Sequence, residues 1–128
     1  MKPSYGVVDS DGHINEPEER LREYIEGPYS QWNKPFHLHS FFDNTIGDKL
    51  GTNGPPGFPT PDEWLRVADK GGMETVYIYP TTLLQYASIT DPDYLVALTK
   101  AYNNYLSEEW LKHSPRFKSV ALMPMLEV

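Results

Sequence analysis

Thr75-Val76-Tyr77-Ile78-Tyr79 is the stretch that decides the fold, because it is a β-prone and almost continuously apolar run that precedes a helical pattern. The helical pattern covers residues 92–112, with Asp91 before it as an N-cap. Its apolar positions recur at intervals of three and four residues: Leu95, Leu98, Tyr102, Tyr105 and Leu106. A second apolar run follows at residues 119–123. Strand, helix and strand in this order predict a parallel βαβ unit with a right-handed crossover.

A third apolar run at residues 5–9 predicts another strand, and a second helix precedes residue 75. Thr60 and Glu63 have the spacing of a capping box at the start of this helix, and Gly71-Gly72 end it. The alternation of strands and helices is typical of an α/β protein. Because the strands are apolar without alternation, we expect a parallel sheet that is covered on both faces.

A long insertion at residues 26–59 follows the first strand, and its Gly and Pro content predicts irregular structure. Its aromatic side chains are too apolar to remain in water, so we expect the insertion to pack on another surface. They are Tyr29, Trp32, Phe36, Phe41, Phe42 and Phe58. His37 and His39 have a ligand-like spacing but follow no strand, which favours a packing or lid role.

The composition excludes several classes of function. The chain has 128 residues, with 11 Lys and Arg against 18 Asp and Glu, and this net charge of -7 argues against binding to nucleic acid or an anionic membrane. It has no cysteine, so any metal must be held by His and carboxylate groups. Since it shows neither a membrane-spanning stretch nor a signal peptide, we expect a soluble cytoplasmic protein with one domain over residues 1–128.

Polar residues are concentrated at the end of the first strand, where the ligands of a parallel α/β sheet collect. Asp11 and His13 are separated by one residue, so in extended backbone their side chains point to the same side and can share one cation. One carboxylate and one imidazole suit Zn²⁺ or Mn²⁺, and Gly12 lets the backbone turn closely beside them. On spacing alone, a capped turn with a surface histidine is the commoner explanation.

The ordered series of motifs resembles the amidohydrolase-related metal-dependent hydrolases, the family that includes aminocarboxymuconate semialdehyde decarboxylase and the resorcylate-type decarboxylases. Residues 9–17 resemble the opening strand of that family, residues 62–81 its helix and second strand, and residues 101–124 its next helix and third strand. The resemblance implies a TIM (β/α)₈ barrel in which Asp11 and His13 hold a divalent metal, with Zn²⁺ preferred over Mn²⁺. It also implies that Asp9 supports these two ligands.

Three further residues are candidates for the same site. Thr81 and Thr82 follow the second strand and are placed to touch a substrate, and Glu16 is placed to orient His13. Ordinary turn capping explains each of them almost as well. Replacing an imidazole by the Asp11 carboxylate lowers the charge at the metal, which is compatible with decarboxylation or hydration rather than hydrolysis.

A complete barrel takes about 250 residues, so we interpret these three strands as the amino-terminal part of such a barrel. The catalytic residues are then expected on strands outside this chain, and the isolated segment is expected to be inactive. Its partner would be a carboxyl-terminal segment or a second copy of the chain.

The first hypothesis is therefore a metal-dependent decarboxylase or hydrolase that acts on a small carboxylated or aromatic compound. The alternative is a non-catalytic α/β binding module that uses the aromatic insertion to bind a protein. Metal analysis separates these hypotheses, because the module has no reason to hold Zn²⁺ or Mn²⁺.

Overall fold

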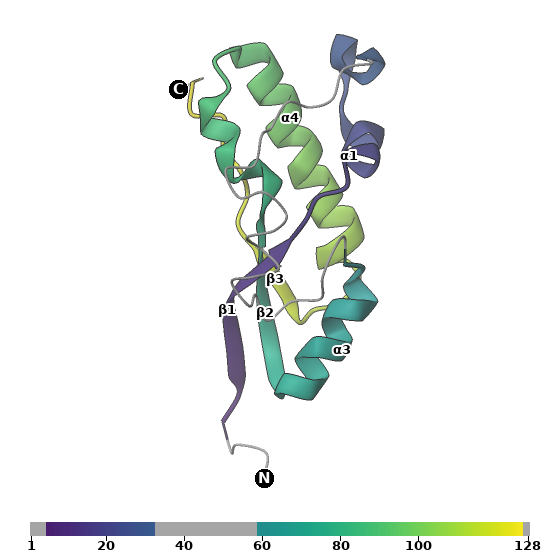
Figure 1. The fold of residues 1–128 in the computed structure, drawn as a ribbon, viewed down its shortest axis with the longest axis vertical. Helices are drawn as coiled ribbons and strands as arrows, with labels where there is room; N and C mark the ends of the chain where they lie inside the picture. The colour runs from purple at the N-terminus through teal and green to yellow at the C-terminus, as the bar shows by residue number, and fades with distance from the viewer. Residues whose placement is uncertain (1–4, 33–58, 127–128) are drawn as a thin grey trace.

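The structure, a computed structural model, describes residues 5–32 and 59–126 (Figure 1). Strands β1 (Val7–Ile14), β2 (Met73–Pro80) and β3 (Phe117–Ser119) form an open parallel sheet in the order β1-β2-β3. Helix α3 (Pro61–Gly71) precedes β2, and helix α4 (Pro92–Tyr105) lies between β2 and β3 in the chain. The predicted α/β class, the parallel pairing and the strand order are confirmed.

Both predicted helices begin at the expected caps. The side chain of Thr60 accepts a hydrogen bond from the backbone N–H of Glu63, and the Glu63 carboxylate accepts one from the backbone N–H of Thr60. Asp91 accepts a hydrogen bond from the backbone N–H of Tyr94 at the start of α4. Gly72 ends α3 in the left-handed conformation, at a φ of 66°. Helix α4 continues as a π-helix, η3 (Leu106–Leu111), so the helical segment has nearly the predicted length.

Two strand boundaries differ from the prediction. Strand β1 reaches Ile14, so Asp11 and His13 lie within the strand and not in the loop after it. The expected strand at residues 119–123 is wrong, because β3 ends at Ser119. The backbone N–H and C=O of Leu122 instead pair with the side-chain amide of Asn103, both at 2.9 Å. This amide replaces a β-ladder as the partner of the backbone.

Three short helices were not predicted from the sequence. They are the α-helix α1 (Glu18–Tyr24) and the 3₁₀ helices η1 (Gly27–Gln31) and η2 (Thr82–Ser88). Their lengths give too few turns for an apolar periodicity to stand out. Helix η2 is important for the site, because it begins where β2 ends.

The core lies between the sheet and helices α1, α3 and α4, which lie on the same side of the strands in Figure 1. The strands contribute buried side chains to it: Ile14, Val76, Ile78 and Phe117. On the strands, Val8 is 55% exposed and Tyr77 is 36% exposed. Among the described residues no helix covers this second face of the sheet. The expected burial of both faces is therefore not found in this part of the chain.

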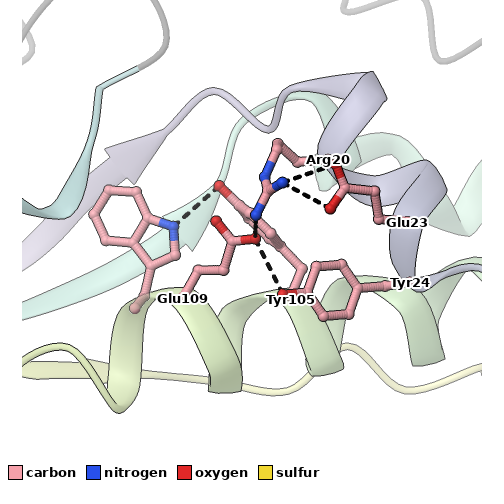
Figure 2. A network of polar contacts seen from close by, with 6 residues as sticks. Arg20, Glu23, Tyr24, Tyr105 and Glu109 are labelled. Carbon is pink, nitrogen blue, oxygen red and sulfur yellow. Dashed lines mark hydrogen bonds and ion pairs between the residues drawn. The ribbon is translucent and has the colours of Figure 1, made fainter.

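A polar network joins α1 to the π-helix η3, as Figure 2 shows. The guanidinium of Arg20 binds the carboxylates of Glu23 and Glu109. The hydroxyl of Tyr24 donates to Glu109 at 3.0 Å, and the indole N–H of Trp110 donates to the hydroxyl of Tyr105 at 3.0 Å. The contacts of Arg20 and Tyr24 with Glu109 hold α1 against the end of the long helix, whereas the Trp110–Tyr105 bond lies within that helix.

The insertion is described only at its two ends. Tyr29 and Trp32 pack against Tyr94 of α4, with ring centroids 5.3 and 5.2 Å from that of Tyr94. The predicted packing of the other aromatic residues, and the roles of His37 and His39, lie outside the described residues. None of the described helices is both long enough and apolar enough to cross a membrane.

Candidate functional site

A bulge in β1 shapes the candidate site. Asp9 pairs with Val76 and Gly12 pairs with Ile78, so β1 uses one more residue than β2 between these two pairs. The backbone N–H of Asp11 donates to the Asp9 carboxylate at 3.1 Å, inside the bulge. Bulges commonly re-aim a side chain at the edge of a sheet. Asp9 therefore supports the local backbone at Asp11.

The structure brings the two predicted metal ligands together on β1. Nε2 of His13 lies 3.5 Å from Oδ1 of Asp11. The Asp11 side chain is 90% exposed, whereas only 26% of the His13 side chain is exposed. The imidazole is therefore held by its surroundings, and the carboxylate reaches it from the solvent side.

His13 is held by the end of the neighbouring strand. Its Nδ1 lies 2.9 Å from the carbonyl oxygen of Pro80, and the hydroxyl oxygen of Thr81 lies 3.5 Å from the same nitrogen. A carbonyl oxygen can only accept a hydrogen bond, so Nδ1 must carry the proton. In the neutral imidazole, Nε2 then has the free lone pair, and this atom faces Asp11.

Glu16 joins the ends of β1 and β2 from within the protein. Its carboxyl group accepts hydrogen bonds from the backbone N–H of Thr81, at 3.1 and 3.3 Å, and of Thr82, at 2.9 Å. The residue is only 4% exposed, and this burial raises the pKa of its carboxyl group to about 7, although the backbone hydrogen bonds oppose the shift. The structure thus brings together the predicted site residues Glu16, Thr81 and Thr82. The contacts join the carboxyl group of Glu16 to the backbone N–H groups of the two threonines and not to their side chains.

The pair of Asp11 and His13 fits part of a metal site. Two ligands that each lie about 2.1 Å from one tetrahedral Zn²⁺ are about 3.4 Å apart. The observed separation of 3.5 Å is close to this value, and a carboxylate with an imidazole is a suitable donor pair. Among residues 5–32 and 59–126 no third His, Asp or Glu completes the group. Within the described residues the candidate donors are therefore limited to this pair.

Sequence reasoning missed two participants at the strand ends. Nothing about the residue type of Pro80 indicates that its carbonyl would bind His13. Tyr102 of α4 is the second: its hydroxyl is buried close to Ser119 of β3 and to Glu16. Burial, and next the charge of Glu16, raise the pKa of Tyr102 above its usual range. Only its position on the apolar side of α4 signalled burial in advance.

The comparisons with known proteins add no relative. A scan against protein-family models found no matching family, and a search of curated proteins found no similar sequence. Membership of the metal-dependent hydrolases thus stays a prediction that rests on the sequence motifs.

A cavity of about 330 Å³ lies at the opposite end of β2, away from His13. Its lining includes Tyr5, Asp69, Met73 and Arg116. The guanidinium of Arg116 is already bound to the Asp69 carboxylate, at 2.7 Å, and to the carbonyl of Met73. The Arg116 guanidinium is thus already paired, whereas Asp11 and His13 lie at the other end of the sheet.

Proposed function

We propose that this chain is the amino-terminal part of a metal-dependent decarboxylase or hydrolase related to the amidohydrolases. Its substrate would be a small carboxylated or aromatic compound. The observation that carries the proposal is the arrangement of His13: Nδ1 is bound to the Pro80 carbonyl, and Nε2 lies 3.5 Å from Asp11. Protein-bound metals commonly use such a histidine, whose second nitrogen donates to a backbone carbonyl.

The open sheet supports the barrel interpretation. In a (β/α)₈ barrel the helices surround parallel strands, and the inner face of the strands is covered by the strands opposite. Here α1, α3 and α4 lie on one side of the three strands, whereas Val8 and Tyr77 are exposed on them. The sheet of the described residues thus has the layer order of a barrel wall.

Each residue at the site has a separate task in this proposal. Asp11 and His13 would hold the divalent metal, with Zn²⁺ preferred over Mn²⁺, and Asp9 holds the bulge that carries Asp11. When bound, the metal supplies Lewis-acid chemistry for an oxygen of the substrate. Thr81, beside the imidazole, is near enough to contact that substrate. The carboxylate ligand lowers the local charge, which favours decarboxylation over hydrolysis.

A metal titration tests the proposal directly. We expect Co²⁺, followed by its visible absorption, to bind the chain at one site that Zn²⁺ competes for. His13→Ala and Asp11→Asn should each weaken this binding at least tenfold. His113→Ala is the matched control, because His113 also faces an aspartate, Asp62, but forms a direct hydrogen bond of 2.8 Å with it. Equal affinity in the wild type and in His13→Ala would refute the proposed site.

One observation favours the second candidate function, a binding module for a protein partner. Trp32 is 42% exposed although it stacks on Tyr94. The ring of Tyr29 packs edge-on against Trp32, with the two ring centroids 4.9 Å apart. Exposed aromatic clusters are common at protein interfaces. A folded chain that binds no Co²⁺ would support this function over the enzyme.

A further inference from the structure

We infer that Glu16 is a positioning residue that selects which nitrogen of His13 is free to bind a metal. The inference rests on the proposed function for the role of that nitrogen. Its structural content is independent of any metal, because it concerns the contacts between Glu16, the peptide groups after β2 and the imidazole.

The peptide group between Pro80 and Thr81 connects the two side chains. This group is planar, so the carbonyl of Pro80 and the N–H of Thr81 move together and point in opposite directions. The N–H donates to Glu16, and the carbonyl accepts from Nδ1 of His13 at 2.9 Å. Glu16 therefore binds the N–H of this rigid peptide group, and His13 donates to its carbonyl oxygen.

The contacts of Glu16 exceed those of an ordinary turn cap. A helix is usually capped by a residue adjacent to it in sequence, whereas Glu16 lies 65 residues before Thr81. Its two carboxyl oxygens receive the N–H groups of both Thr81 and Thr82, and the side chain is almost completely buried. A buried carboxyl is costly without such partners. Its placement thus fixes the start of η2 relative to β1.

Loss of the hydrogen bonds between Glu16 and the N–H groups of Thr81 and Thr82 would change the tautomer of His13. If the Pro80–Thr81 peptide rotates, its carbonyl no longer accepts from Nδ1, and the imidazole can move its proton to Nε2. That nitrogen would then donate to Asp11, which lies 3.5 Å away. A protonated Nε2 has no lone pair for a metal. Glu16 thereby favours the tautomer that leaves Nε2 open.

The first experiment measures the His13 tautomer in the whole chain without metal. Two-bond ¹H–¹⁵N correlation spectra near pH 8.5, where an ordinary imidazole is neutral, separate the two tautomers. We expect the Nδ1–H form in the wild type and a substantial Nε2–H population in Glu16→Gln, since the amide puts an NH₂ donor where one carboxyl oxygen accepts the N–H of Thr81. The His13→Ala spectrum assigns the signal. An Nε2–H form in the wild type would overturn the inference, whatever the variants do.

The second experiment measures Co²⁺ affinity in the same variants. Removal of an outer partner of a metal ligand typically weakens binding 10–100-fold, and we expect that loss in Glu16→Gln. Glu63→Gln is the matched control, because Glu63 also accepts a backbone N–H, that of Thr60, but at the start of α3. It should leave both the tautomer and the affinity unchanged. An unchanged tautomer and affinity in folded Glu16→Gln would refute the positioning role.

The two proposals fail separately. If the wild type binds no Co²⁺, the proposed function is wrong, whereas the tautomer of His13 still decides the role of Glu16. If Glu16→Gln does not fold, hydrogen exchange of the wild type replaces it. The amides of Thr81 and Thr82 should then be protected to the level of core amides, and fast exchange at both would contradict the inference.

Discussion

Gly12 lies so close to Tyr77 that no side chain fits between the two strands at this point. A Cβ atom at Gly12 would be 2.7 Å from the carbonyl oxygen of Tyr77 and 2.8 Å from a methyl group of Val76. Because the first of these atoms belongs to the backbone of β2, it can move only if the sheet moves. Gly12 stands between Asp11 and His13 in the sequence, so the two residues of the candidate metal site flank this close approach.

We therefore predict that Gly12→Ala destabilises the protein by about 1–3 kcal/mol, the usual cost of overpacking. Urea unfolding of the wild type and the variant measures the difference. Gly6→Ala is the control, because a Cβ there would meet only the movable carboxylate of Glu74. Gly12→Ala should also weaken Co²⁺ binding, since the strand must shift at Asp11 and His13. Equal stability in the two variants would contradict the packing argument.

The buried carboxyl of Glu16 predicts a pH dependence of stability. Burial raises its pKa to about 7 from an ordinary 4.5, so the folded state binds this proton more tightly than the unfolded state. The contribution of the protonated Glu16 carboxyl to the free energy of unfolding is therefore complete below pH 4.5 and is lost as the pH rises through 7. From the shift, the loss is on the order of 3 kcal/mol.

Glu16→Gln removes this titration. The difference in unfolding free energy between the wild type and Glu16→Gln should therefore change between pH 4.5 and 7 and be constant above that range. Chemical unfolding at several pH values measures the difference, and all other groups cancel in it. A difference that is independent of pH would show that the carboxyl is not buried in the folded protein.

The hydrogen bond between Trp110 of the π-helix and Tyr105 predicts a loss of stability when the Tyr105 hydroxyl is removed. This hydroxyl accepts the buried indole N–H of Trp110, five residues later, so Tyr105→Phe leaves that N–H without a partner. A buried donor that loses its partner costs about 1–3 kcal/mol. Thermal or urea unfolding should show this loss, whereas Tyr5→Phe, at an exposed tyrosine, should change stability by less than about 0.5 kcal/mol.

The second face of the sheet predicts self-association. Val8 lies on the edge strand β1 and is exposed, and open parallel edges invite pairing with another chain. Sedimentation should detect dimers at high concentration, and Val8→Lys should weaken the dimer by about tenfold, since a buried valine contributes about 1.5 kcal/mol or more. Val96→Lys changes an exposed valine on α4 and should leave the dimer intact. A chain that stays monomeric at all concentrations would exclude this surface as an interface.

Local signals in the sequence were sufficient for helices α3 and α4 and for the strand order. The capping box of Thr60 and Glu63 and the cap at Asp91 act over three residues, so the residue types alone predict where α3 and α4 begin. The helix between the second and third strands requires a crossover, which makes those strands parallel. The approach of Asp11 to His13 also follows from local spacing, because both residues belong to one extended strand.

Tertiary structure alone decided what surrounds His13. Its contact with the Pro80 carbonyl spans 67 residues, and the contacts of Glu16 with Thr81 and Thr82 span 65 and 66. All three contacts use backbone atoms, which every residue type except proline, with its missing N–H, presents alike. The bulge that sets the register of β1 likewise exists only relative to β2. Residue types predict the side chains of a site, but only the packing of two strands determines which peptide groups meet them.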